Sequence, residues 1–212
     1  MNPSTAALRR YTSLPALLYL LRRRALTLVP PASWEDRNDS RYLELYRERK
    51  SLGAVRALCF TETGETFHHW RVFTEPVSGV CVQFSRATLL RAVAREPGLR
   101  HGRVRYVRLS DARTRPPALE ALPFVKRWAF QDEREYRLIW HGADPHVGAH
   151  DVAIPLHAIR SVTLAPGMHA SLAREVKDTL RCVPGCARLP VVHSKLLESA
   201  EWVRLGSRAA PP

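Results

Sequence analysis

The 212-residue sequence predicts a single α+β domain with a curved, mostly antiparallel sheet, continuous or split in two, and flanking helices. Short runs of alternating apolar and polar residues indicate strands, and apolar residues three and four positions apart indicate helices. The two kinds of run follow each other irregularly, unlike the regular alternation that predicts a parallel sheet. No repeat or change of composition divides the chain. We therefore expect one domain over residues 1–205 and a disordered tail over 206–212.

The first half of the chain is expected to begin with a helix that Ser13 caps and that Arg22–Arg24 close, since cations suit a helix C-terminus. A strand over Leu26–Val29 follows. Asp39 is expected to cap the next helix, which stops at Gly53. The elements expected after it are a strand (Ala54–Phe60), a helix (Phe67–Phe73), a strand (Val80–Phe84) and a helix that Ser85 caps.

The second half is expected to contain a strand over Val104–Leu109, and a helix from Pro116 to about Trp128. An acidic strand begins at Arg134, and a loop covers 142–149. The remaining expected elements are strands over Asp151–Leu156, Ser161–Leu164 and Arg188–Val192 and a helix over Ala170–Cys182.

The chain is strongly basic, with 33 Lys and Arg against 20 Asp and Glu, a net charge of +13 and a pI near 10.4. This balance favours contact with phosphate, nucleic acid or an acidic partner, although an arginine-rich composition also accompanies GC-rich genomes. The cations are spread along the chain. No signal peptide or apolar run long enough to cross a bilayer is found, and four cysteines are expected to be reduced thiols. These features predict a cytoplasmic protein without a membrane partner.

The most informative segment is Lys126–Trp140, where a basic and aromatic stretch leads into an acidic strand. Strand periodicity places Glu133, Glu135 and Arg137 on one face, with Arg134, Tyr136 and Leu138 on the other. Neighbouring carboxylates are costly unless a cation, a ligand or a raised pKa relieves their repulsion. The pair is therefore a candidate catalytic site. The alternative is a solvated face that Arg134 and Arg137 neutralise.

Several segments together resemble the bacterial family called domain of unknown function 2971. The landmarks occur in order between Arg10 and Pro166: Arg10-Tyr11, Leu26-Thr27-Leu28, Trp34-Glu35-Asp36, Cys59-Phe60-Thr61, Trp70, Ser78–Phe84, Val104-Arg105-Tyr106, Lys126, Trp128, Glu133, Glu135 and Arg137. The chain departs from the family pattern at Arg37-Asn38-Asp39, where a more compact acidic motif is usual. The same order of residues also has a weaker likeness to ADP-ribosyltransferases, which hold NAD between two small sheets.

The second likeness implies an NAD-consuming enzyme, either an ADP-ribosyltransferase or an NAD glycohydrolase. It implies that Glu135 stabilises the cationic ribose as nicotinamide leaves, and that Glu133 orients or deprotonates the acceptor. The implied substrate-binding residues are Arg10 on the pyrophosphate, Tyr11 and Trp70 stacked on a ring, Ser78 near the ribose, and Arg137. The structural alternatives are a surface cation for Arg10, core aromatics for Tyr11 and Trp70, and a turn residue for Ser78.

Two other classes of function remain open. Arg103, Arg105 and Arg108 decorate the expected strand over Val104–Leu109 and could follow a nucleic-acid backbone, or form a solvated basic edge. A non-catalytic interaction domain, with its acidic pair in salt bridges, is the other alternative. Nine histidines are present, but none has the spacing of a metal site on a fixed frame, so no metal is expected. The acceptor and the oligomeric state are not defined by the sequence.

Overall fold

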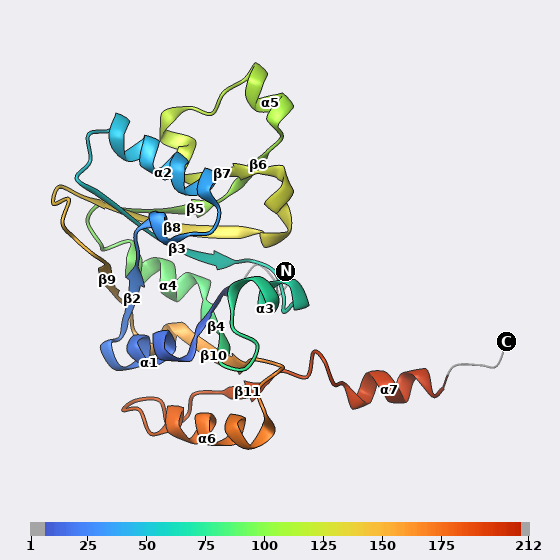
Figure 1. Cartoon of the computed structure of the whole chain (residues 1–212). Helices are drawn as coiled ribbons and strands as arrows, with labels where there is room; N and C mark the ends of the chain where they lie inside the picture. The colour runs from blue at the N-terminus through green and yellow to red at the C-terminus, as the bar shows by residue number, and fades with distance from the viewer. Residues whose placement is uncertain (1–6, 209–212) are drawn as a thin grey trace.

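The computed structural model describes residues 7–208. Within them, the main sheet has seven strands in the order β11-β10-β4-β1-β3-β8-β5. All neighbouring strands of this sheet are antiparallel except β10 and β11. Helices flank the open sheet (Figure 1). The predicted α+β class with a mostly antiparallel sheet is confirmed.

The strands of the main sheet are β1 (Ala7–Ser13), β3 (Ala54–Thr61), β4 (Gly79–Ser85), β5 (Leu99–Arg103), β8 (Glu135–Gly142), β10 (Ile159–Leu164) and β11 (Val191–His193). Two small pairs lie outside it: β2 (Ala25–Leu28) with β9 (His150–Ala153), and β6 (Arg105–Val107) with β7 (Val125–Arg127). The α-helices are α1 (Leu14–Arg23), α2 (Arg37–Arg49), α3 (Phe67–Phe73), α4 (Arg86–Val93), α5 (Leu109–Thr114), α6 (Ala170–Arg181) and α7 (Ala200–Gly206). The 3-10 helices are η2 (Pro31–Ser33), η3 (Leu119–Phe124), η4 (Trp128–Glu133) and η5 (Leu156–Ala158).

The sheet has a weak seam between β1 and β3. These strands are paired at one position, Arg9 with Thr61, whereas β1 pairs with β4 from Ala7 to Ser13. Further along β3, Val29 replaces β1 as the neighbour and forms two backbone hydrogen bonds with Ala57, of 3.0 and 2.9 Å. The two strands therefore diverge, and the divergence leaves room for side chains and a pocket in the middle of the sheet.

The two faces of the sheet are covered differently. The largest apolar cluster joins one face to α1, α4 and α6 and includes the fully buried Phe84. On the other face, Leu43 and Tyr46 of α2 pack against Val55 and Ala57 of β3, while α3 covers the β1–β4 half. Figure 1 shows α2 and α4 on opposite sides of β3 and β8. Between α2 and α3, the second face is left without a continuous apolar cover.

The start of α2 differs from the prediction, because Asp36 and not Asp39 caps the helix. The Asp36 carboxylate accepts backbone hydrogen bonds from Asn38 and Asp39, at 3.0 and 3.3 Å. Asp39 is instead buried in the first turn and is bound by Arg137. A buried carboxylate needs a cationic partner, and this requirement outweighs the local capping preference.

The segment between Val104 and Trp128 was predicted wrongly in two places. No continuous strand covers Val104–Leu109: Val104 separates β5 from β6, and β6 leaves the main sheet to pair in parallel with β7. The expected helix to Trp128 is replaced by η3, β7 and η4. Pro123 lies within this segment and cannot donate a backbone hydrogen bond, which disfavours a regular α-helix there.

The last helix, α7, ends at Gly206, where the tail expected to be disordered over 206–212 begins. The helix α7 has no buried residue and extends away from the body of the molecule (Figure 1). Residues 209–212 of the expected disordered tail lie outside the described residues. No helix between residues 7 and 208 combines the length and the apolar character needed to cross a membrane. All four cysteines are free thiols.

Candidate active site

A pocket of about 340 Å³ opens at the seam between β1 and β3. This volume lies within the range of small-molecule sites, roughly 300–1,000 Å³. Its walls come from the two diverging strands, the start of α2, the exposed side of α3, and η4. The lining residues used below are Arg10, Tyr11, Asp39, Cys59, His69, Phe73, Lys126, Phe130, Glu133 and Glu135. The pocket therefore joins segments from both halves of the chain.

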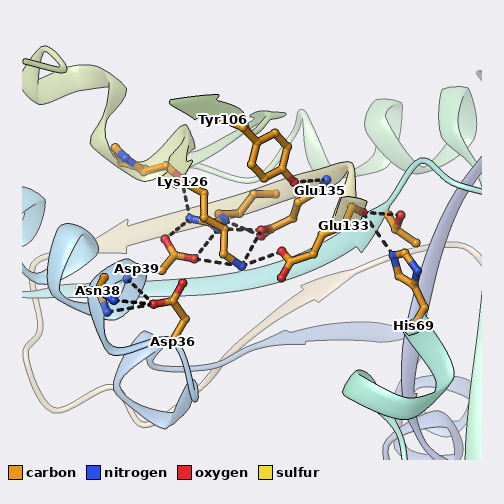
Figure 2. Close-up of polar contacts among 11 residues, drawn as sticks. Asp36, Asn38, Asp39, His69, Tyr106, Lys126, Glu133 and Glu135 are labelled. Carbon is orange, nitrogen blue, oxygen red and sulfur yellow. Dashed lines mark hydrogen bonds and ion pairs between the residues drawn. The ribbon is translucent and has the colours of Figure 1, made fainter. Parts of the chain in front are cut away.

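Lys126 lies at the centre of a buried acidic cluster at the base of this pocket (Figure 2). Its Nζ donates to Glu133 Oε2 at 2.6 Å and lies 3.6 Å from Glu135 Oε2 and 3.7 Å from Asp39 Oδ2. All three carboxylates come from different elements: α2, η4 and β8. A single lysine thus links three acidic groups that would otherwise repel each other.

Arg137 completes the cluster from beneath the pocket. Its side chain is 0% exposed, and it binds two carboxylates in bidentate fashion. Glu135 accepts from Nε at 2.7 Å and from Nη2 at 2.9 Å, and Asp39 accepts from Nη1 at 3.0 Å and from Nη2 at 2.7 Å. Nη1 also donates to the Pro123 carbonyl at 3.0 Å. A buried guanidinium with this many partners is fixed in position.

The cluster shifts the pKa values of its two glutamates in opposite directions. Burial raises the pKa of Glu133 to about 7, because the stabilisation by Lys126 does not fully compensate for lost hydration. Burial also acts to raise the pKa of Glu135, but Arg137 and Lys126 outweigh it and lower that pKa to about 2. The pKa of Asp39 is raised, with burial as the largest cause and Arg137 opposing it. Glu135 is therefore a permanent carboxylate at neutral pH, whereas Glu133 exchanges a proton there.

The backbone around the two glutamates is held by contacts from three directions. Arg134, between them, adopts a left-handed conformation with φ 43°. The Glu133 carbonyl accepts from Thr61 Oγ1 at 2.6 Å and lies 3.4 Å from His69 Nε2. The Glu135 N–H donates to the Tyr106 hydroxyl at 2.8 Å. This turn places Glu133 just before the strand, while Glu135 and Arg137 share one strand face as predicted.

Arg10 occupies the gap between the diverging strands. It donates from Nη1 to the Cys59 carbonyl of β3 at 3.2 Å and forms no ion pair with the described residues. Burial lowers the pKa of Arg10 to about 10. A desolvated guanidinium without a carboxylate is suited to an anionic ligand. Arg10 and Glu135 line the same pocket, so these two sequence candidates are brought together.

Of the other predicted binding residues, Tyr11 lines the pocket and Trp70, Ser78 and Arg137 do not. Tyr11 lines the pocket, but Trp70 lies behind it, with the two ring centroids 5.0 Å apart and the indole N–H on Glu65 at 2.8 Å. Ser78 lies in the turn before β4 and is not among the pocket residues, and Arg137 is covered by the residues that it binds. Of the predicted set, Arg10, Tyr11, Glu133 and Glu135 line the pocket.

Sequence reasoning missed Asp39, His69 and Phe130 as pocket residues. His69 Nδ1 lies 2.6 Å from Thr66 Oγ1, and burial lowers the pKa of His69, so its imidazole is neutral at neutral pH. Phe130 could have been found from the sequence, because it is one of the aromatic residues of the Lys126–Trp140 segment. Asp39 had none, because its partner Arg137 is distant in the sequence.

The predicted arginines of the nucleic-acid alternative do not follow one strand: Arg103 ends β5, Arg105 begins β6 and Arg108 precedes α5. Arg103 donates to Glu62 at 2.7 Å, while Arg105 is exposed on β6. The Arg108 guanidinium lies 4.9 Å from the ring centroid of Trp128, which is 42% exposed. Among the residues that the structure describes, no group of three or more metal-ligating side chains is placed to hold a metal ion.

No protein-family model and no curated protein sequence matches the chain, so the resemblance to domain of unknown function 2971 stays a prediction. Structures of Thermus sp. 2.9 DarT are similar to it. The complex with ADP-ribosylated ssDNA is 14% identical, with 91% of this chain and 96% of that chain covered and a TM-score of 0.47. The complexes with NAD+ and with carba-NAD+ are each 13% identical and cover 92% of this chain, with 98% and 97% of those chains and TM-scores of 0.47 and 0.44. A likeness at this level assigns neither residues nor activity.

Proposed function

We propose that the pocket at the β1–β3 seam is the active site of an enzyme that cleaves NAD, as an ADP-ribosyltransferase or an NAD glycohydrolase. One observation carries the proposal: a buried acidic cluster with a permanent and a titrating glutamate shares a pocket with a half-buried arginine that has no acidic partner among the described residues. The guanidinium of Arg10 has a backbone carbonyl but no carboxylate as its partner among the described residues, which supports an anionic ligand in this pocket.

The pocket residues supply what the substrate needs for binding. Arg10 would bind the pyrophosphate through charge-assisted hydrogen bonds, with no carboxylate competing for its guanidinium. Tyr11, Phe73 and Phe130 line the same pocket and offer aromatic surface to the nicotinamide or adenine ring. Neutral His69 lies among these rings, 5.3 Å from Tyr11 and 5.6 Å from Phe73, measured between centroids. The ligand would therefore be gripped between β1, α3 and η4.

The acidic cluster supplies the charge for bond cleavage. When the bond between nicotinamide and ribose breaks, nicotinamide leaves with the electron pair and the ribose carbon gains positive charge. When all groups are ionised, the three negative charges of Asp39, Glu133 and Glu135 exceed the two positive charges of Lys126 and Arg137 by one. This net negative charge would stabilise the cationic ribose. Both oxygens of Glu135 are held by Arg137, which favours a fixed electrostatic role over direct attack on the ribose.

Glu133 would act as the general base. Its pKa of about 7 lets it accept a proton near neutral pH, where an efficient base is expected to titrate. It would take the proton from the acceptor group, water or another nucleophile, as that group bonds to the ribose carbon. Before this transfer, Lys126 Nζ, which lies 2.6 Å from Glu133 Oε2, stabilises Glu133 as the carboxylate that can accept the proton.

The test is calorimetric titration with NAD, followed by a nicotinamide-release assay, on the wild type and on Glu135→Gln and Glu133→Gln. We expect all three proteins to bind NAD and both variants to release nicotinamide about 100-fold more slowly or worse. The matched control is Glu120→Gln, an exposed glutamate that does not line the pocket and should behave as wild type. Absence of NAD binding, or full activity in Glu135→Gln, would refute the proposal.

A second candidate, nucleic-acid binding, is favoured by the basic and aromatic surface next to the pocket. Exposed Trp128 stacks against Arg108, and Phe130 lies under Lys126 and Arg127, at 4.7 and 5.4 Å from its centroid. Trp128 and Arg127 are exposed, and exposed aromatic and cationic groups bind single strands by stacking and phosphate contact. A mobility-shift titration should show affinity that falls steeply with salt and is weakened by Trp128→Ala. Flat salt behaviour would exclude this candidate.

A further inference from the structure

A second groove, of about 540 Å³, lies along one side of α2, separate from the acidic cluster. Helical positions of a single face of α2 form one wall, and the opposite wall comes from η2, the start of β3 and the loop at Pro145. The groove shares no lining residue with the pocket at the β1–β3 seam. Figure 1 shows the helix α2 lying over the sheet at this end of β3. Neither proposed function uses this groove.

The groove is strongly basic. Its charged lining residues are Arg37, Arg41, Arg47, Arg56 and one acid, Glu44. That acid is already engaged, because Arg47 donates to both of its oxygens at 2.7 and 3.1 Å. Arg41 is paired with Glu48 at 3.0 Å. Two guanidinium groups, those of Arg37 and Arg56, have no carboxylate partner among the described residues.

Arg56 is the unusual member of this set, since its side chain is buried with a residue exposure of 9%. Its Nη1 donates to the Val55 carbonyl at 2.7 Å and its Nη2 to the Val147 carbonyl, while its Nε has no partner. By contrast, the buried Arg137 binds two carboxylates. A buried cation without a counter-charge is unfavourable, and an unsatisfied buried donor adds to the cost. An anion bound in the groove would supply the missing counter-charge.

We propose that this groove is a second ligand site, which binds the phosphate group of a molecule of nucleotide size. Arginine guanidinium groups match phosphate oxygens in geometry as well as charge, and several of them converge here around one engaged carboxylate. The volume accommodates a nucleotide-sized ligand beyond its phosphate. The proposal does not depend on the NAD-cleaving function, because none of its residues belongs to that pocket.

The test is calorimetric titration with inorganic pyrophosphate in an Arg10→Gln background, which removes the anion-binding cation of the first pocket. Arg56→Met and Arg37→Ala are each added to this background, and the matched control is Arg49→Ala, an exposed arginine of α2 outside the groove. We expect pyrophosphate affinity to fall about tenfold or more with Arg56→Met and with Arg37→Ala, and to stay unchanged with Arg49→Ala. Arg37 is exposed, so its variant reports on binding even where Arg56→Met perturbs folding.

Unchanged affinity in both groove variants, or no pyrophosphate binding by the Arg10→Gln protein at millimolar concentration, would overturn the proposal. A parallel titration compares ATP with a single-stranded oligonucleotide as the source of the phosphate. Tighter binding of ATP, lost with Arg56→Met, identifies a free nucleotide. Tighter binding of the oligonucleotide, lost in the same variant, identifies a nucleic-acid backbone. Both results support a phosphate site in the groove.

Discussion

Replacement of Arg137 by methionine tests the claim that the acidic cluster depends on this one buried cation. The change removes the bidentate contacts to Glu135 and Asp39 and leaves Lys126, at 3.6 and 3.7 Å, as the remaining cation near both carboxylates. Methionine keeps the apolar bulk of the arginine stem. The loss is therefore mainly electrostatic, with little contribution from a cavity.

The magnitude follows from the pKa of Glu135, which the folded protein lowers from 4.5 to about 2. A shift of this size corresponds to roughly 3 kcal/mol of stabilisation. Breaking a buried ion pair by removing one partner typically costs about 3–5 kcal/mol, and Asp39 loses the same partner. We expect the free energy of unfolding of Arg137→Met to be about 3–5 kcal/mol below that of the wild type at neutral pH.

The assay is urea unfolding followed by circular dichroism at several pH values. In the wild type, the contribution of Glu135 is complete above its unfolded pKa and is lost as the pH falls toward its folded pKa of about 2. In Arg137→Met, burial raises the pKa of both carboxylates without the opposing effect of Arg137, so they take up protons more readily as the pH falls and their repulsion is relieved. The two proteins should therefore converge in acid.

Two results would refute this reasoning about Arg137. One is a loss below about 1 kcal/mol at neutral pH, and the other is a loss that does not change with pH. Arg41→Met is the control, because it removes a cation from an exposed pair with Glu48, whose side chains are 56% and 42% exposed. The control should lose at most about 1 kcal/mol.

Two further predictions concern the neighbouring residues. Burial raises the pKa of Glu133 to about 7, so its ionisation disfavours the folded state as the pH rises from about 4.5 through 7. Glu133→Gln should therefore be more stable than the wild type by roughly 1–3 kcal/mol near pH 8.5 and equal to it near pH 4, measured by urea unfolding; a constant difference would contradict the assigned pKa. Arg134 has a φ of 43°, a conformation that glycine adopts without steric cost. The free energy of unfolding of Arg134→Gly should therefore equal that of the wild type or exceed it by up to about 1 kcal/mol, and its melting temperature should be equal or higher. Arg127→Gly, at an exposed position with φ −66°, is its control and should be destabilised.

Local patterns were sufficient to predict many of the elements. The helix α3 was predicted with its observed bounds, and the alternation in Val80–Phe84 predicted β4 to within one residue at each end. Alternation also placed Glu135 and Arg137 on one face of β8, opposite Tyr136 and Leu138. These features follow from contacts between residues close in the sequence, where the periods of helix and strand act directly.

The sequence also directed attention to the correct region of the candidate site. Arg10, Tyr11, Glu133 and Glu135 were named together from their order along the chain, and the fold places all four around one pocket. Trp70 was named for the same reason but packs behind Tyr11. An aromatic residue in a short helix has the same local pattern whether it faces a pocket or a core, so the pattern could not distinguish the two.

What the sequence by itself determined is the class of the fold, the faces of the regular strands and the group of residues that deserved attention. Only the tertiary structure decided how the charges are paired. Arg137 binds Asp39, which is 98 positions away in the chain. Because of this ion pair, Asp39 lies at the base of the pocket and does not cap the helix as expected. The segment between Val104 and Trp128 likewise follows β6–β7 pairing and not its own helical pattern. In each case the free energy of satisfying a buried charge or a backbone hydrogen bond exceeds the weak local preference, and the partner that satisfies it is brought close only by folding.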